Sequence, residues 1–225
     1  MRISEAVKQV DHRTEVSRIL SGYGYKRVGD GTDALVFGKA DDGPVIKIII
    51  PWNRMFAPKG KVKDLISSRK NIFLSWMKFC EENSGNPHLP KFIKLDMKPI
   101  TIDSEEFELH GMEKLKKRIS DSEHNMSLAM SRSIQYNYTF EQCIDEFQEE
   151  INNYKSKGNY PGLIKEKQKE LAMALKLKNF YDTMAAVIKE GKRLGFRDDI
   201  FTSLDKTTNI MKRADNTLVI ADPWV

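Results

Sequence analysis

Two stretches near the amino terminus decide the fold: Val28–Phe37, which reads VGDGTDALVF, and Val45–Ile49, which reads VIKII. Both contain β-branched and apolar residues next to turn-forming ones, so they predict short strands joined by hairpin turns. Gly29 and Gly31 lie two residues apart, and a backbone without side chains there can turn tightly over an anion. An ordinary glycine-containing hairpin explains the first stretch equally well when it is considered alone.

Lys47 stands in the middle of the second stretch, and a lysine in so apolar a strand is costly unless its ammonium meets an anion. A dinucleotide-binding fold would need a helix directly after the glycines, but a hairpin follows them here. A Walker-type loop would end in Lys-Ser or Lys-Thr, and this one does not. The arrangement that remains is a kinase-type glycine loop followed by a strand lysine. Ala34 takes the place of its third glycine, and Val36 follows in the returning strand.

The order of predicted elements indicates an α+β protein. The first part is expected to form an antiparallel sheet with helices to one side, from helices over 2–22 and 61–82 and strands within 25–50, 91–97 and 107–112. The later part is expected to be helical over 121–134, 139–154 and 161–192, followed by a hairpin of 210–213 and 218–221. Thr139 and Gln142 predict a capping box, and Pro161 suits a first helical turn.

The stretch NIMKRADNTLVIADP, residues 209–223, places a polar residue at each open end of the predicted carboxyl-terminal hairpin. Asn209 precedes the first strand and Asp222 follows the second. Side-chain oxygens of these two types can share a metal ion. A loop asparagine and an Asp-Pro turn are sufficient explanations for each residue alone.

Together these stretches resemble the protein-kinase superfamily, and most of all its compact branch in tailed phages, which includes early serine/threonine kinases and kinase-like relatives. The resemblance rests on VGDGTDALVF, VIKI, the helix ending in WMKFC, the NPHLPKF loop, MEKL and NIMKRADNTLVIADPW, in the family's order over essentially the whole chain. Asn209 and Asp222 have the family's separation of 13 residues. The resemblance implies a two-lobed, protein-kinase-like fold. Its antiparallel-sheet N-lobe would cover 1–112, and a truncated, mostly helical C-lobe would cover 113–225.

The resemblance also implies roles for the residues that match the family's first motifs. Gly29 and Gly31 would cover the phosphates of ATP, and Ala34 and Val36 would complete the glycine loop. Lys47 would hold the α- and β-phosphates.

The later motifs supply the remaining implied roles. Asn209 and Asp222 would hold Mg²⁺, with Asp222 standing where the DFG aspartate stands. Met112–Leu115, which includes Glu113, would be the strip between the lobes that meets adenine. Lys206 takes the place of a phosphate-neutralising lysine.

The sequence departs from the family at the catalytic base, which should lie five residues before the metal-binding asparagine. Leu204 occupies that position. Asp205 could serve after a local backbone shift, Asp199 could reach in from further upstream, or the base is absent and the chain is a pseudokinase. We take Asp205 as the candidate base. The expected acidic partner of Lys47 is also unusual, because Asp64 is the only acid between Lys47 and Cys80 and is one methylene shorter than the family's glutamate. A first-turn acid favourable to the helix dipole is the alternative explanation for Asp64, and it suffices for this residue alone.

Composition limits the function classes. The 225 residues carry a net charge of +5, contain two cysteines and include no apolar run long enough to cross a membrane. With no secretory signal at the amino terminus, the cytoplasm is the expected location. The lysines of 155–178 predict a solvated helix face, with a contact surface for an acidic protein or RNA as the alternative. Tyr160 is the only aromatic residue among these lysines, so single-strand stacking is not favoured.

The function expected from the resemblance is transfer of phosphate from ATP, with Mg²⁺, to Ser or Thr of a host protein. A pseudokinase that binds and modulates a host protein is the alternative, and a small-molecule phosphotransferase is a weaker one. The sequence stops three residues after Asp222, where kinases continue into an activation segment. Substrate choice is therefore expected to depend on the helices of 121–190, on an oligomer or on a bound partner.

Overall fold

The computed structural model describes residues 11–40, 43–50, 62–116, 119–158, 160–196, 209–221 and 223–224, with backbone only for 62–66. The chain divides into two compact units. The sheet unit comprises Met1–Glu81 and Lys91–Lys114, and the helical unit comprises Glu82–Pro90 and Leu115–Val225. The segment 82–90, which begins with the last residue of the helix Val62–Glu82, thus belongs with the helical unit, although the residues on both sides of it belong to the sheet unit.

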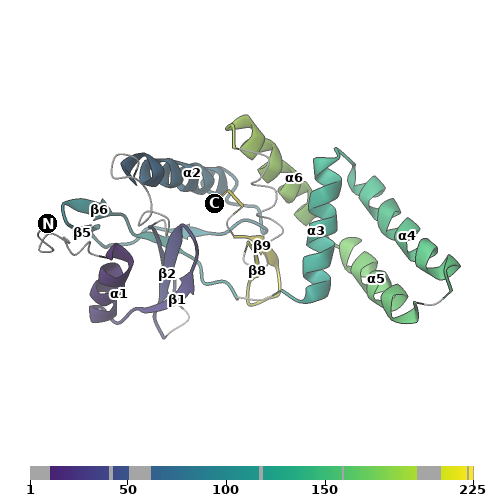
Figure 1. Cartoon of the computed structure of the whole chain (residues 1–225), viewed down its shortest axis with the longest axis horizontal. Helices are drawn as coiled ribbons and strands as arrows, with labels where there is room; N and C mark the ends of the chain where they lie inside the picture. The colour runs from purple at the N-terminus through teal and green to yellow at the C-terminus, as the bar shows by residue number, and fades with distance from the viewer. Residues whose placement is uncertain are drawn as a thin grey trace, which may run out of the picture. The chain divides into compact units, whose positions relative to one another are not determined.

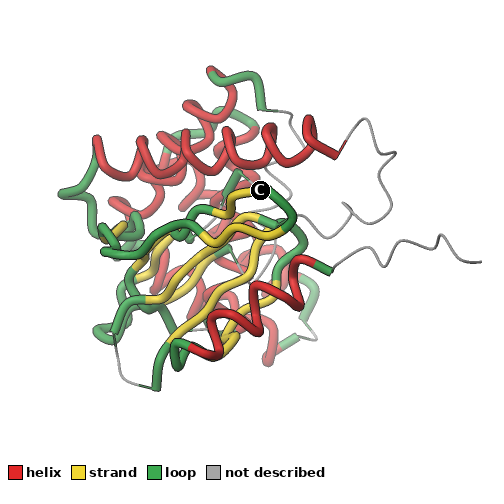
Figure 2. The backbone as a smooth tube through the Cα atoms, turned by 90° about the vertical axis from the view of Figure 1, so that its left-hand side faces the viewer, coloured by secondary structure: helices red, strands yellow, loops and turns green. Residues whose placement is uncertain are grey.

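The sheet unit is built around an antiparallel sheet of five strands in the order β1-β2-β3-β7-β4. The strands are β1 (Lys26–Asp30), β2 (Ala34–Gly38), β3 (Val45–Ile49), β7 (His110–Met112) and β4 (Phe92–Ile93). Figure 2 shows them side by side with the twist that is usual for sheets. The strands predicted within 25–50 are confirmed, and the lysine-bearing strand β3 lies in the centre of the sheet.

Helices cover both faces of this sheet, so the expectation of helices on one side is wrong. Side chains alternate along a strand, and Ile46 and Ile48 point to the face where α1 (His12–Gly22) contributes Val16 and Leu20 to the core. The small sheet of β5 (Ile100–Ile102) and β6 (Glu105–Phe107) packs on this same face. Lys47 points to the other face, which meets the helix α2 (Val62–Glu82).

The hairpin β5–β6 was not predicted. Ile100–Ile102 lies inside the stretch expected to be a connection, and the strand predicted over 91–97 is reduced to Phe92–Ile93. The turn residues Asp103 and Ser104 both have positive φ, 49° and 66°, as the commonest two-residue hairpins require. Asp-Ser is a weak sequence signal for such a turn because neither residue is glycine.

The helical unit contains four helices and a hairpin within its described residues. These are α3 (Asp121–Gln135), α4 (Phe140–Ser156), α5 (Pro161–Ala174), α6 (Lys178–Arg193), β8 (Ile210–Lys212) and β9 (Leu218–Ile220). Figure 1 shows α3 with α6 on one side and α4 and α5 on the other. The predicted capping box of Thr139 and Gln142 is present, Pro161 begins α5, and the carboxyl-terminal hairpin forms as predicted.

The single helix predicted over 161–192 is two helices, and that prediction is wrong. The chain turns at Leu175–Leu177, where the amides of Lys176 and Leu177 bond to carbonyls three residues back. The sequence ALKLKN holds no glycine or proline to signal this break. Helix α6 has a continuous apolar stripe in the core, whereas α5 buries only Glu170 and Ala174, so tertiary packing overrides the local preference for helix.

Trp224 is buried near the end of the chain, at 1% exposure. Its ring nitrogen donates to the carbonyl of Val187 on α6. Gly191 makes room for the ring, because a Cβ at this position would lie 3.0 Å from the indole nitrogen. None of the helices in the described part of the chain is both long and apolar enough to span a membrane.

Candidate functional site

A row of four residues crosses the sheet on the α2 face. Gly29 of β1 is paired with Val36 of β2, Val36 with Lys47 of β3, and Lys47 with His110 of β7. Directly opposite residues on neighbouring strands share a face, so these four are neighbours. Three predicted site residues, Gly29, Val36 and Lys47, are thus brought together, whereas His110 was not predicted.

Gly29 is needed for the close approach within this row. A Cβ at Gly29 would lie 3.1 Å from the Cβ of Val36, tighter than ordinary van der Waals contact. The register of β1 and β2 also shifts between Arg27 and Gly29, so the glycine marks a bulge. The bulge bends β1 as it enters the turn.

Lys47 is buried, with 5% of its surface exposed in a strand whose residues are all buried. Its Nζ lies 4.8 Å from the ring centroid of Phe73 on α2. A desolvated cation–π contact of this kind contributes about 2 kcal/mol, whereas desolvation of an ammonium costs several kcal/mol. The remaining stabilisation must come from negative charge, supplied by the chain or by a ligand. The predicted partner Asp64 has its side chain outside the described residues.

His110 stands next to Lys47 and is held in its neutral form. Burial lowers the pKa of His110, nearby Glu108 raises it, and the charges of Lys70 and Lys47 lower it further. The imidazole packs edge-on against Phe73, with ring centroids 5.0 Å apart. The nearby Lys70 forms an ion pair with Glu108 at 2.6 Å. Because His110 is neutral, Lys47 carries the positive charge of the row.

Arg13 holds the glycine turn from the α1 side, a contact that the sequence analysis missed. Its side chain is 5% exposed. Nη1 donates to the carbonyls of Ile50 (2.8 Å) and Thr32 (3.3 Å), and Nη2 donates to that of Gly31 (2.7 Å). Arg13 lies on the same helical stripe as Val16 and Leu20, so a charged residue on a predicted apolar face was the available signal.

The charges around the turn sum to an excess of positive charge. Arg13 pairs with Asp30, Arg27 lies 3.5 Å from the same carboxylate, and Arg69 of α2 lies 3.4 Å from buried Asp33. Three guanidinium groups therefore accompany two carboxylates. Such a surplus attracts anions to the turn.

Gly31 and Ala34 close the turn itself. The amide of Gly31 donates to the carbonyl of Ala34 at 3.0 Å, directly where β1 passes into β2. Ala34 is 6% exposed and pairs with Ile49 of β3. A small residue at position 34 therefore lies in the closely packed part of the sheet, as the glycine-loop pattern requires.

Glu113 lies at the end of β7, where its role is at least partly structural. Its amide donates to the carbonyl of Lys91, and its carboxylate accepts the amide of Lys91 at 2.8 Å. These contacts extend the pairing of β7 with β4. One carboxylate oxygen of this predicted adenine-strip residue is thus engaged by the backbone.

Asn209 directly precedes β8 of the hairpin β8–β9 and is 8% exposed. Its carbonyl accepts the amide of Ala221 at 2.7 Å, so the hairpin holds Asn209 beside the residue that precedes Asp222. Asp222 itself is outside the described residues. An amide oxygen and a carboxylate are hard donors that suit Mg²⁺, so the residue types at this end of the hairpin fit the predicted ion.

Several predicted residues cannot be placed. Asp199, Leu204, Asp205 and Lys206 lie in 197–208, outside the described residues. Within the described part of the chain, no three His, Cys, Asp or Glu side chains gather as a metal cluster. The metal-binding role expected of Asp222 stays a prediction.

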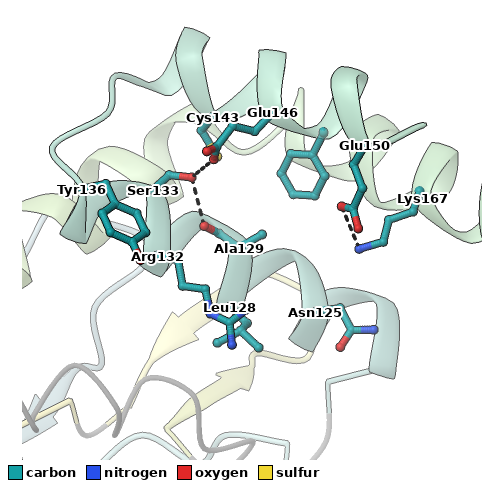
Figure 3. A pocket seen from close by; sticks show the side chains of 11 residues that line it. Asn125, Leu128, Ala129, Arg132, Ser133, Tyr136, Cys143, Glu146, Glu150 and Lys167 are labelled. Atoms are coloured by element: carbon teal, nitrogen blue, oxygen red, sulfur yellow. Dashed lines mark hydrogen bonds and ion pairs between the residues drawn. The ribbon is translucent and has the colours of Figure 1, made fainter. Parts of the chain in front are cut away.

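The helical unit contains a separate pocket of about 540 Å³ between α3, α4 and α5 (Figure 3). Ser133 donates to Glu146 at 2.7 Å, and Lys167 is paired with Glu150 at 3.1 Å, so these polar groups satisfy one another. Burial raises the pKa of the Cys143 thiol, which makes it a poor nucleophile. This pocket therefore lacks an activated reactive group.

The basic stretch of 155–178 runs from the end of α4 through α5 into α6. Two of its lysines are paired: Lys167 with Glu150 and Glu170, and Lys178 with Asp182. Most of the others are exposed, as expected for a solvated helix face. A partner for this surface stays a prediction.

The row on the sheet unit, Gly29–Val36–Lys47–His110, is the strongest site that the geometry supports. Comparison of the chain with protein-family models, with curated proteins and with solved structures finds no match.

Proposed function

We propose that this chain is a kinase-like phosphotransferase that binds ATP with Mg²⁺ and transfers its γ-phosphoryl group to Ser or Thr of a protein. The observation that carries the proposal is buried Lys47 on the third strand, in register with Val36 and Gly29 of the glycine hairpin and followed in sequence by α2. A strand lysine beside a glycine loop is the arrangement with which kinases hold nucleotide phosphates.

The charges of the sheet unit support a phosphate ligand in particular. Lys47 offers a point charge in a site of low dielectric constant, where it interacts strongly with an anion. At the adjacent turn, the three guanidinium groups of Arg13, Arg27 and Arg69 outnumber two carboxylates by one. His110 is neutral, so Lys47 supplies the positive charge of the row.

Asn209 and Asp222 would hold the Mg²⁺, which neutralises charge on the β- and γ-phosphates. Asp205 would accept the proton of the substrate hydroxyl as the oxygen of that hydroxyl forms a bond to the γ-phosphorus. The bond from that phosphorus to the β–γ bridging oxygen breaks, and ADP leaves. The resemblance to phage kinases makes a host protein the expected substrate.

A pseudokinase is the second candidate, and the apolar Leu204 at the family's base position favours it. Such a protein would bind nucleotide, or a host protein, without transfer. Phosphoryl transfer depends mostly on positioning and charge neutralisation, so loss of the usual base lowers the rate without necessarily abolishing it.

Two measurements on the purified chain separate these functions. Calorimetric titration with ATP and Mg²⁺ reports binding, and incubation with γ-labelled ATP and bacterial lysate reports transfer. Binding with transfer supports the kinase, and binding without transfer supports the pseudokinase. Absence of ATP binding at millimolar concentration would show that the proposed function is wrong. The variant Lys47→Met is the negative control for both measurements.

A further inference from the structure

We propose that Arg13 is a positioning residue for phosphate binding: from α1, it orients the glycine turn so that the backbone amides of Thr32 and Asp33 face the phosphates. This inference rests on the proposed function, because it assigns ligand-facing groups to the same site. Arg13 itself does not touch the ligand in this arrangement.

The contacts of Arg13 are nearly all made with backbone oxygen atoms of one turn and one strand end. Gly31, Thr32 and Ala34 accept from it at 2.7, 3.3 and 3.4 Å, and Ile50 accepts at 2.8 Å. A planar guanidinium with fixed donor directions is suited to hold several carbonyls at once. Hydrogen bonds to a charged group are also stronger than neutral ones.

These contacts determine where the turn's amides point. In a planar trans peptide group, the carbonyl of one residue and the amide N–H of the next point in opposite directions. No cis peptide occurs among the described residues. Because the carbonyls of Gly31 and Thr32 are turned toward Arg13, the amides of Thr32 and Asp33 are turned away from it. Successive outward N–H groups are the elements from which backbone anion sites are built.

Arg13 also ties the turn to the strand that carries the lysine. Its Nη1 bonds to the carbonyl of Ile50, just beyond β3, and the amide of Ile50 donates to the carbonyl of Asp33 at 2.9 Å. Lys47 lies three residues before Ile50 in the same extended segment. The turn and the lysine are therefore held in a fixed relation before any ligand arrives, which lowers the ordering cost of binding.

A purely structural clamp would stabilise α1 against the sheet and leave ligand selectivity unchanged. The test therefore compares two ligands, one with phosphates and one without. The variants are Arg13→Met, Arg13→Lys and, as a matched control, Val16→Ala. Val16 is also buried on α1, in the same core, but makes no contact with the turn by hydrogen bonding.

Calorimetry with ATP and Mg²⁺, and separately with adenosine, is the first readout. Arg13→Met should weaken ATP binding at least about tenfold, the scale of one or two lost hydrogen bonds to a charged ligand, and should leave adenosine affinity within about twofold. Arg13→Lys keeps the positive charge but lacks the planar guanidinium, so it should retain part of the ATP affinity that Arg13→Met loses. Val16→Ala should lower the melting temperature and leave both affinities unchanged.

Amide hydrogen exchange without nucleotide is the second readout, and it does not depend on activity. Exchange at residues 31–35 should accelerate in Arg13→Met relative to Val16→Ala. Equal exchange in these two variants, or equal weakening of ATP and adenosine, would overturn the inference. If the wild-type chain binds no ATP while exchange still accelerates, the proposed function fails and the phosphate role of Arg13 fails with it, but the clamp on the turn stands. If Arg13→Met does not fold, both the calorimetry and the hydrogen exchange are compared between Arg13→Lys and Val16→Ala instead.

Discussion

Replacing Lys47 with methionine should abolish ATP binding while changing the stability of the free protein only slightly. The side chain is 5% exposed and lies over Phe73 with its Nζ 4.8 Å from the ring centroid. Methionine has similar length, keeps the strand apolar and removes the charge. The variant therefore separates the lysine's packing from its electrostatics.

The expected change in stability follows from this contact. The lost cation–π interaction is worth about 2 kcal/mol, and a methionine sulfur over the same ring returns about 1 kcal/mol. Relief of ammonium desolvation, which costs several kcal/mol, offsets the remainder. If a ligand supplies the balancing negative charge, the free energy of unfolding should therefore fall by at most about 1 kcal/mol, or about 2–4 °C in melting temperature for a chain of this size.

The effect on ligand binding should be larger. ATP present at 100 times its dissociation constant adds about 2.7 kcal/mol to the stability of the wild-type protein. On the same scale this is a rise of about 5–10 °C, which Lys47→Met should lose. Thermal unfolding by calorimetry, with and without ATP and Mg²⁺, measures both changes in one series.

Ile49→Met is the matched control, because Ile49 lies on the same strand and the same face as Lys47 and is also buried. It should retain the rise with ATP. A full rise in Lys47→Met would refute the assignment of Lys47 as a phosphate ligand. A loss of 3–5 kcal/mol in the free Lys47→Met protein would contradict the stability estimate instead, since about that much is expected when a buried carboxylate is left unpaired.

Three further predictions concern the metal, the pH dependence and the base. Asp222→Ala should remove the part of the ATP-induced rise in melting temperature that depends on Mg²⁺, as a titration with and without EDTA would measure. The pKa of His110 lies below its ordinary 6.5 in the folded chain, mainly because of burial, so the unfolded chain binds the proton first as pH falls. Wild-type stability should therefore decrease below about pH 6.5, and His110→Gln should flatten this decrease in urea unfolding at pH 5 to 8. If Asp205 is the base, Asp205→Asn should lower the rate of phosphate transfer by about two to four decades and Leu204→Asp should not raise it. Full activity of Asp205→Asn would exclude Asp205.

Local signals in the sequence were sufficient for much of the secondary structure. The β-branched run of Val45–Ile49 is a strand because its residues suit a fully buried pleated surface. Thr139 and Gln142 cap α4 reciprocally, which a four-residue pattern alone predicts. By contrast, the break at Leu175–Leu177 and the turn at Asp103–Ser104 carry no glycine or proline, so tertiary contacts set them.

The candidate site shows the same division. Gly29, Val36 and Lys47 could be predicted because their pattern is compact in sequence, and the register of neighbouring strands then places them in one row. His110 joins the row from a strand more than sixty residues further along, and no local pattern announces it. Arg13 reaches the turn from α1. The sequence signal for its role was a charged residue on the apolar stripe of that helix.

The case for negative charge near Lys47 does not depend on the resemblance to kinases. A buried ammonium over an aromatic ring recovers only part of its desolvation cost, so negative charge must supply the rest. Burial lowers the pKa of the adjacent His110 imidazole, and the charges of Lys70 and Lys47 lower it further, so the ring is neutral. If the balancing charge belonged wholly to the protein, a neutral side chain at position 47 would strongly destabilise the fold. If it belongs to a ligand, the same change leaves the fold intact and removes the ligand. Measuring stability and ATP binding on the one variant Lys47→Met thus distinguishes a structural lysine from one that binds phosphate.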